Sequence, residues 1–455
     1  MSTAERMRNY RGPVLFSHGF RAFFLLSSLW TALAMLVWVA MLSGAGILPL
    51  TMDPFSWHAH EFLFGYTSGV IAGFLLTAVP NWTGRLPVIG TPLAGLVGLW
   101  LLGRVALAIS GLLDWRVVMV ADLACTLVLL AFLAREILHG RNWRNLPVLA
   151  LLALFATANA LFHLEAARGE AAFDGMGMRL GLAAVLMLVA LIGGRITPSF
   201  TRNWLAARGR TRLPVPFGRA DGAVLGLTGL TLAGFIAAPE AAWMPWLMLV
   251  TGAAHLWRLA RWQGLQTGAE PLLWVLHLAY ALLALGFWAE GAAGFGLIAP
   301  APARHIWLAG AIGLMTLAVM TRASLGHSGR SLHAGPGTTA LYLALCGAVV
   351  TRLLAGWLPA QLWLLHLSGT LWVIGFGGFA LLYLPVLARP RVAKSRSQGR
   401  AAPPEPCSKK PGRVTGPLSW EKTDQAGCSP QARWHQSRTA ASSPGRAVAS
   451  PSAKP

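Results

Sequence analysis

Charged residues are scarce in this sequence. They make up only 12% of the 455 residues, whereas hydrophobic residues make up 55%. Soluble globular proteins carry about twice that charged fraction. The composition therefore argues against a soluble enzyme or a nucleic-acid-binding module. It predicts an all-α integral membrane protein that crosses the lipid bilayer many times.

Several residue types and motifs that would indicate other classes of protein are also missing. The four cysteines show no C-x-x-C spacing, which argues against a disulfide framework or a zinc site. No lysine occurs before Lys394. No strand pattern is visible, and no Gly-x-Gly-x-x-Gly opens a helix after one. The sequence thus offers no motif for a nicotinamide, flavin or quinone cofactor.

Twelve apolar segments account for most of the chain. Their lengths suit a bilayer core of ~30 Å at ~1.5 Å per helical residue, and they are too close together for soluble domains to fold between them. The segments are roughly residues 21–43, 57–79, 91–112, 115–138, 146–164, 178–198, 219–238, 242–262, 271–290, 304–323, 338–357 and 361–388. We predict one twelve-helix membrane domain over residues 21–388, between an N-terminal segment (1–20) and a C-terminal tail (389–455).

Arginines occur in alternate loops. Arg141 and Arg144 follow the fourth segment and Arg258 and Arg261 follow the eighth, whereas the opposite loops carry few cations and several acids. By the positive-inside rule, both termini are predicted to be cytoplasmic. The net charge of +21 therefore reflects orientation in the membrane, not affinity for nucleic acid. The basic tail has too little apolar content to fold alone, and we predict that it is disordered.

The segments also resemble one another in groups of four. The second, sixth and tenth begin near residues 57, 178 and 304, and each ends in a polar turn with an arginine. Leu-, Ala- and Gly-rich helices look alike by chance, but internal repeats are a common way to build large membrane bundles. Three four-helix units would place these three helices around a pseudo-threefold axis.

Histidine is the only ligand-forming residue type present in number. Five histidines lie at the predicted outer ends of segments: His58, His60, His163, His305 and His366. Neutral imidazole binds copper and haem iron, and helical bundles commonly hold such sites in their cores. Any single intramembrane histidine has an equally plausible structural role. Five at one depth, however, indicate a metal or cofactor site.

Local spacing limits the roles of the first two histidines. His58 and His60 are about 200° apart around a helix, so both face one metal only if the first turn is irregular. The Asp53–Pro54 pair favours a helix start, which would leave one histidine in the preceding turn. Glu61 is a candidate hydrogen-bond acceptor that orients a ligand, or a proton relay. Alternatively, it is simply an acid favoured by the helix dipole.

Two more histidines, His255 and His277, lie toward the predicted cytoplasmic half of the membrane. Arginines in the polar turns, including Arg195 and Arg322, are candidates to bind the propionates of a haem at that depth. Their alternative role as orientation signals explains most of them equally well.

Several long motifs point to one family: GFRAFFLLSSLW (19–30), WHAHEFLFG (57–65), AGFLLTAVPNWTGR (72–85), GGRITPSFTRN (193–203) and VMTRASLGHSGR (319–330). Over nearly all of residues 11–388 the chain resembles the NnrS family. That family comprises bacterial membrane proteins that contain haem and copper and are associated with denitrification and the response to nitric oxide. The resemblance implies a multi-pass protein of the bacterial inner membrane with both cofactors. It assigns no ligands, reaction or electron donor.

The repeat also resembles the catalytic subunit of haem-copper oxidases, in which the second and tenth helices hold a haem near the outer face. His58 or His60, paired with His305, would be the counterpart, and His163 and His366 remain candidates for copper. The sixth segment has no histidine, and neither the seventh nor the tenth has an adjacent histidine pair. An oxidase-type copper centre is therefore not predicted.

Three functions follow from these expectations. The first is a haem and copper protein of nitric oxide metabolism or nitrosative-stress tolerance, in which enzymatic turnover is left open. The second is a transporter of a small solute or metal complex that uses intramembrane histidines. The third is a sensor or accessory protein whose cofactor is structural.

Overall fold

The computed structural model describes residues 10–84 and 86–392, and all regular structure in these ranges is helical. In chain order the membrane helices are α2 (Gly19–Leu42), α3 (Pro54–His60) continuing through η2 (Glu61–Tyr66) into α4 (Thr67–Thr83), α5 (Thr91–Ala108), α6 (Trp115–His139), α7 (Leu146–Ala167), α8 (Met176–Leu188) continuing through η6 (Val189–Gly193) into α9 (Gly194–Ala206), α10 (Arg219–Ala237), α11 (Met244–Ala260), α12 (Pro271–Gly294), α13 (Pro300–His305) continuing through η8 (Ile306–Gly313) into α14 (Leu314–His327), α15 (Pro336–Trp357) and α16 (Trp363–Ala388).

The twelve helices confirm the predicted all-α membrane fold. Within the described residues, eleven are long and apolar enough to cross a membrane. The twelfth, α11, has 17 residues and carries the buried His255 and Arg258. The predicted tail lies outside the described residues from position 393 onward, as do Arg85 and the first nine residues.

The second, sixth and tenth helices share a feature that sets them apart. They contain 30, 31 and 28 residues, and each is interrupted by a π-helical segment, namely η2, η6 and η8. A π-segment inserts an extra residue into a turn and often marks a functional site. Its recurrence in the same helix of each four-helix unit is the arrangement expected of a threefold repeat.

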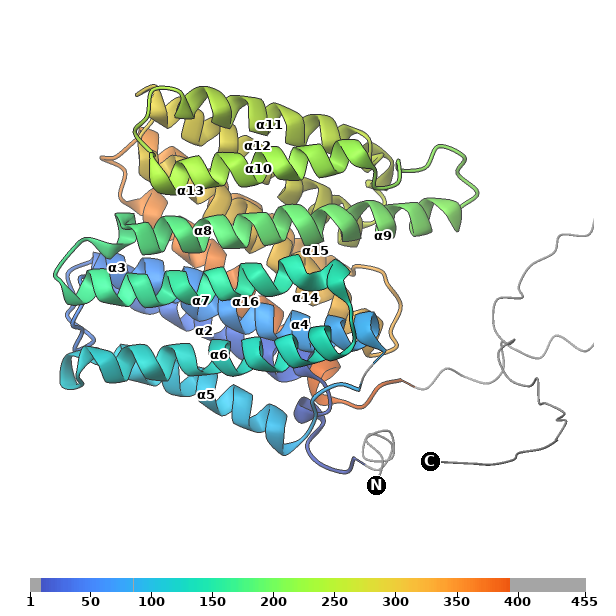
Figure 1. The fold of residues 1–455 in the computed structure, drawn as a ribbon, viewed down its shortest axis with the longest axis horizontal. Helices are drawn as coiled ribbons and strands as arrows, with labels where there is room; N and C mark the ends of the chain where they lie inside the picture. Colours follow the sequence, from blue (N-terminus) through green and yellow to red (C-terminus); the bar gives the residue numbers. More distant parts are fainter. Residues whose placement is uncertain (1–9, 85, 393–455) are drawn as a thin grey trace, which may run out of the picture. The chain divides into compact units, whose positions relative to one another are not determined.

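These three helices also form the centre of the bundle (Figure 1). The second and sixth helices contact each other through η2 and α8, and the sixth and tenth through α8 and η8. The second and tenth contact each other through α4 and α14. Between 61% and 78% of the residues in their most apolar stretches are buried, compared with 28% in α15 and 33% in α2. The motif that begins at Trp57 therefore lies in the core of the molecule.

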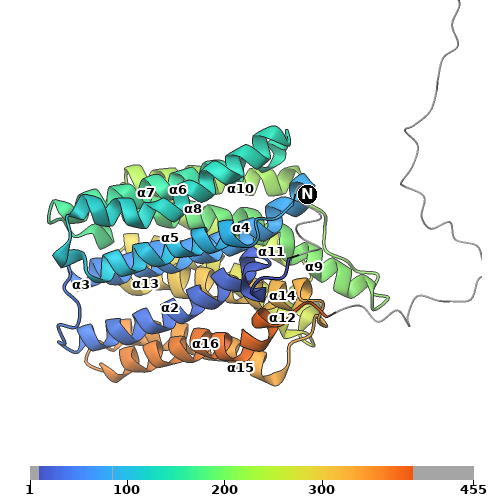
Figure 2. The ribbon, with the colours of Figure 1, turned by 90° about the horizontal axis from the view of Figure 1, so that it is seen from below.

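The other helices pack around this centre, and α12, at 67% buried, is as enclosed as the three central helices. Figure 2 shows α2, α15 and α16 along one side, with α6 and α7 on the opposite side; α2 packs on both α16 and α4. The outer helices expose large apolar side chains such as Leu33 and Leu36 of α2 and Leu381 of α16. Such a surface suits contact with lipid chains.

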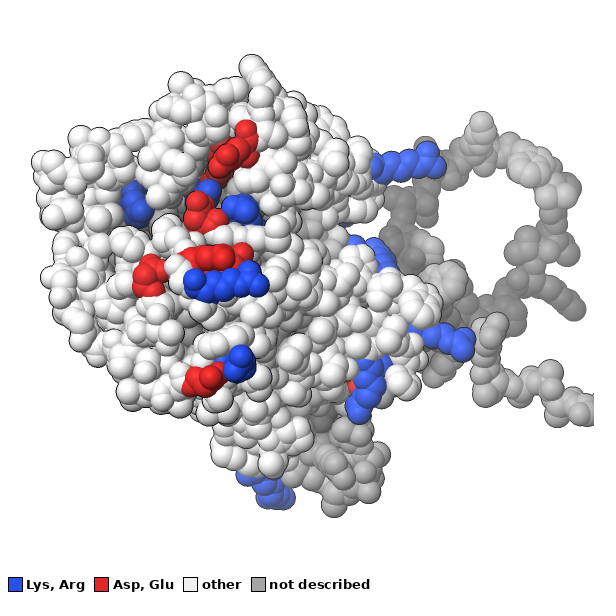
Figure 3. Space-filling model, turned by 60° about the vertical axis from the view of Figure 1, so that its left-hand side comes forward, with Lys and Arg blue, Asp and Glu red and all other residues white. Residues whose placement is uncertain are grey.

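The few acidic residues on the surface gather at the end of the bundle that is predicted to face outward. Figure 3 shows them there beside a small number of basic side chains, surrounded by a surface without Lys, Arg, Asp or Glu. Arg304 pairs with Asp174 and lies 3.6 Å from Glu290, and Arg116 lies 3.9 Å from Asp114. Two cations at this end, Arg116 and Arg304, therefore lie beside acids.

Candidate metal centre

The helix that carries His58 and His60 begins where the sequence predicts. The Asp53 carboxylate accepts hydrogen bonds from the backbone N–H groups of Phe55 (2.9 Å) and Ser56 (3.0 Å), and Pro54 occupies the first helical turn. This N-cap satisfies backbone donors that have no partner within the helix. Both histidines lie inside α3, so the expectation that one of them lies in the preceding turn is wrong.

The two histidines face different parts of the bundle. The His58 ring stacks on Trp38 with centroids 4.3 Å apart and is tilted against Phe62. The His60 ring instead lies 5.0 Å from that of His163. This divergence agrees with the ~200° that separates residues i and i+2 on a helix.

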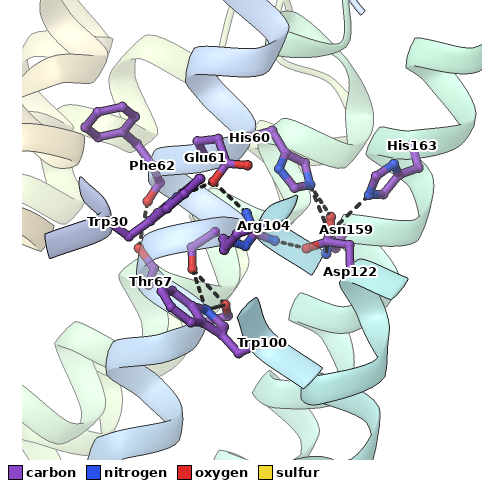
Figure 4. A network of polar contacts seen from close by, with 12 residues as sticks. Trp30, His60, Glu61, Phe62, Thr67, Trp100, Arg104, Asp122, Asn159 and His163 are labelled. Carbon is purple, nitrogen blue, oxygen red and sulfur yellow. Dashed lines mark hydrogen bonds and ion pairs between the residues drawn. The ribbon is translucent and has the colours of Figure 1, made fainter. Parts of the chain in front are cut away.

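His60 and His163 meet a carboxylate that the sequence analysis did not single out. Nε2 of each imidazole lies 3.1 Å from Oδ2 of Asp122 on α6, and both rings point toward this oxygen in Figure 4. One donor atom from each residue lies within 4.8 Å of the others. All three side chains are buried, with exposed fractions of 0%, 4% and 6% for His60, His163 and Asp122. We refer to these three residues as the His60 cluster.

Neighbouring polar groups fix the orientation of Asp122. Its Oδ1 accepts a hydrogen bond from the guanidinium of Arg104 on α5, and its Oδ2 accepts one from the Asn159 amide at 2.6 Å. The amide oxygen of Asn159 lies 2.9 Å from His60 Nε2. Asn159 thus bridges the aspartate and one of the histidines.

Arg104 links Glu61 to Asp122 of the cluster. Its Oε2 accepts hydrogen bonds from Arg104 Nη1 and from the Trp30 indole N–H, each at 2.6 Å. The guanidinium lies directly against Gly65 of η2, where a Cβ atom would overlap both Arg104 and Glu61. The glycine therefore provides the space in which the arginine can bind two carboxylates.

The charges of this network do not balance. Glu61 and Asp122 are two buried carboxylates that share one buried guanidinium, Arg104. An uncompensated charge at such a depth is costly. The two imidazoles that face Asp122 are the groups placed to offset the excess, either by holding a proton or by holding a metal cation. Two imidazoles and a carboxylate are a donor set that suits first-row transition metals.

The other predicted outer histidines lie outside this cluster. The imidazole of His305, at the end of α13, has its Nδ1 2.7 Å from the Ala301 carbonyl. His305 and Arg352 lie near enough to His58 for their charges to act on it. His366 is exposed on α16, and the structure does not bring it to the cluster.

The two histidines predicted in the cytoplasmic half belong to other contacts. His255 uses both ring nitrogens, with Nδ1 2.9 Å from the Tyr280 hydroxyl and Nε2 2.9 Å from that of Thr228. His277 Nε2 lies 2.9 Å from the Thr201 hydroxyl. The structure gives these residues hydrogen-bonded, structural surroundings.

Arg195 and Arg322, which were considered together with those histidines, instead line a large cavity between α4, α9 and α14. Neither His255 nor His277 lines that cavity; the histidine that does is His327. The lining of this cavity therefore includes the two arginines but not the histidines with which the sequence associated them.

Sequence reasoning missed Asp122, Arg104 and Asn159, although a signal was present. Arg104 and Asp122 are charged residues inside two neighbouring apolar segments. A charge in the interior of a membrane helix normally has a partner on another helix. Opposite charges on adjacent segments were therefore a sign that the two helices meet through these side chains.

Comparison with known proteins agrees with this architecture. A family model described as NnrS protein matches residues 14–391, which include every described membrane helix. No curated protein and no solved structure matches the chain. The match covers well over half of the sequence, and the chain belongs to the NnrS protein family.

Proposed function

We propose that this protein is a haem- and copper-containing protein of the bacterial inner membrane that acts in nitric oxide metabolism or in tolerance of nitrosative stress. Family membership supports the general class. The observation that carries the proposal is the His60 cluster, in which two imidazoles face a carboxylate whose charge Arg104 only partly offsets. We assign copper to this cluster. Bound copper or haem iron would supply a redox-active centre able to bind a small ligand such as nitric oxide.

The residues of the cluster fit a metal of this size. Metal–nitrogen and metal–oxygen bonds of about 2.0–2.2 Å place donor atoms on opposite sides of an ion roughly 4 Å apart, and the three donors lie within 4.8 Å of one another. Arg104 and Asn159 hold the Asp122 carboxylate, and Glu61 holds Arg104 in turn. Such outer contacts commonly orient metal ligands.

A small cavity adjoins this cluster. His163 lines a small cavity of about 20 Å³ beneath the loops that contain Thr51 and Ser110. The volume suffices for about one water molecule. This position would allow a small molecule or a proton to approach the histidine from outside.

We propose His58 and His305 as the haem ligands on the neighbouring side of the second helix. The hydrogen bond from His305 Nδ1 to the Ala301 carbonyl leaves Nε2 as the free ligand atom. His58 Nδ1 is buried and has no hydrogen-bond partner among the described residues. Both observations fit histidines that would hold haem iron through a ring nitrogen. Trp38 and Phe62, which pack against His58, would form part of the apolar surroundings.

The first test uses the full chain purified in detergent after expression with ample haem and copper. We expect copper near one per chain and a haem band in the reduced-minus-oxidised visible spectrum. His163→Ala should remove copper and keep haem, whereas His305→Ala should remove haem and keep copper. His139→Ala is the matched control, because His139 is exposed at the far end of the helix that carries Asp122. Copper retained at the wild-type level in both His60→Ala and His163→Ala would refute the assignment.

A further inference from the structure

A second cavity, far larger than the one beside His163, has no residue in common with the His60 cluster. It encloses about 840 Å³ where the predicted cytoplasmic halves of α4, α9 and α14 meet, and it is also bordered by α2 and residues 142–145. Pockets for small organic ligands typically measure about 300–1,000 Å³. The second, sixth and tenth membrane helices therefore each contribute to one ligand-sized space.

Three arginines from different parts of the chain line this cavity. Arg144 precedes α7, Arg195 lies in α9, and Arg322 lies in α14. None of them forms a hydrogen bond or ion pair with any residue in the described ranges, and no Asp or Glu lines the cavity. The charges of Arg144 and Arg195 repel each other. The Arg322 guanidinium stacks on the Phe200 ring at 4.1 Å, which holds it in place.

Glu270, the acid whose charge acts on Arg322, is bound to other groups. Glu270 interacts with Arg322 only through its electrostatic field. Its carboxylate oxygens bind the His333 ring and the backbone N–H groups of Leu272 and Ala334. The cavity consequently keeps an excess of positive charge.

The remaining lining is mostly apolar. Aromatic and aliphatic side chains form the walls, and amide side chains add hydrogen-bonding groups: Phe24, Phe74, Trp82, Ile192, Asn81 and Asn142. Arg144 is exposed, whereas Arg195 and Arg322 are half-buried. A half-buried arginine without a counter-charge is costly, and an anion would remove that cost. A small inorganic anion would leave the apolar walls in contact with water. A ligand with an apolar body would cover them.

We propose that this cavity binds an organic anion that has an apolar body and a carboxylate or phosphate group. Arg144, Arg195 and Arg322 bind the anionic oxygens, because a guanidinium donates two parallel hydrogen bonds to such groups. The aromatic walls contact the body of the ligand. An inner-leaflet lipid and a cytoplasmic metabolite share this chemistry. The proposal does not depend on the copper and haem assignments.

The test measures binding of 1-naphthyl phosphate to the full chain by isothermal titration calorimetry, in nanodiscs of phosphatidylcholine. Inorganic phosphate lacks the apolar body, and 1-naphthol lacks the anion. We expect 1-naphthyl phosphate to bind at least ~10-fold more tightly than either of them. Arg195→Gln and Arg322→Gln should each raise its Kd by ~10-fold or more. Arg210→Gln, an equal change of charge at an exposed site beyond α9, should leave Kd unchanged.

A second variant guards against misfolding of the arginine mutants. Ala78→Trp fills the cavity without altering its charge, and it should abolish binding. Copper and haem contents should stay at wild-type levels in all variants, because the metal ligands lie elsewhere.

Nanodiscs that contain phosphatidylglycerol distinguish the two sources of the anion. A raised Kd for 1-naphthyl phosphate identifies a lipid head group as the competing ligand, and an unchanged Kd identifies a cytoplasmic anion. Equal affinity of wild type and the glutamine variants, or of 1-naphthol and 1-naphthyl phosphate, would overturn the proposal.

Discussion

Two buried polar networks, one in the first third of the bundle and one in the second, share a design and differ in chemistry. In each, a glycine in or next to a π-segment lies directly against a buried guanidinium. Gly65 faces Arg104, and Gly194 faces Arg258. Each arginine then binds an aspartate on a neighbouring helix. The repeated plan indicates that the glycine–arginine contact is a structural element of the fold.

The difference lies in what surrounds the aspartate. Asp221 accepts hydrogen bonds from Arg258, Arg261 and the Gly218 backbone N–H, so cations and a backbone donor satisfy it fully. Asp122 shares its only arginine with Glu61 and faces two imidazoles. A carboxylate with surplus cations is structural, whereas one that lacks them is placed to attract a further positive charge.

The largest expected effect separates the two aspartates. Asp221→Ala would leave the fully buried Arg258 without a carboxylate, and we expect it to lower the free energy of unfolding by about 3–5 kcal/mol. Copper content should not change. Asp122→Ala should destabilise less, because Arg104 keeps Glu61, and it should abolish copper binding. Denaturant titration and metal analysis of both variants check the contrast, which fails if Asp122→Ala retains copper.

A smaller effect is expected at the two glycines. Gly65→Ala and Gly194→Ala each add a methyl group that overlaps a guanidinium, and each should cost about 1–3 kcal/mol of stability. Only Gly65→Ala should also lower copper content. Gly95→Ala provides the control, because a Cβ there meets open space. Equal copper loss in the two variants would mean that the networks are coupled, against this account.

The smallest expected effect concerns the histidines. His255→Ala removes a ring that bonds to two hydroxyl groups, so it should cost roughly 1–3 kcal/mol for the buried partners left behind. His163→Ala loses one hydrogen bond, to Asp122, and this carboxylate keeps Arg104, Asn159 and His60 as partners, so the variant should cost less than His255→Ala in the metal-free protein. Thermal unfolding of metal-free samples measures both. If His163→Ala lowered the free energy of unfolding more than His255→Ala, the distinction between a structural network and a metal-binding one would be contradicted.

The sequence predicts the membrane architecture well because that architecture follows from local properties. Apolar runs of sufficient length and the alternation of arginines indicate twelve helices, and the structure confirms them. The three π-segments were not predicted. A π-turn changes the pairing of backbone groups and has no characteristic composition. The rotation of each helix about its axis, which decides which residues meet, is therefore hard to obtain from sequence.

The candidate site was only half predicted for the same reason. His60 and His163 were proposed from their depth, and the structure brings them together. His366 shares that depth but lies on an exposed face. Asp122 and Arg104 escaped notice because single charges disappear in the average of a long apolar segment. The depth of a residue in the membrane can be predicted from its position in the sequence. The direction of its side chain depends on how the helices pack against one another.

The most direct test of the central claim is copper K-edge X-ray absorption spectroscopy of the purified full chain. The account predicts nitrogen and oxygen neighbours at about 2.0–2.2 Å, outer-shell scattering from two imidazoles and no sulfur. The His163→Ala sample should lose this signal. Copper bound through sulfur, or copper with an unchanged spectrum in His163→Ala, would contradict the assignment. A protein without copper or haem, even when both are supplied, would contradict the redox function itself and favour transport.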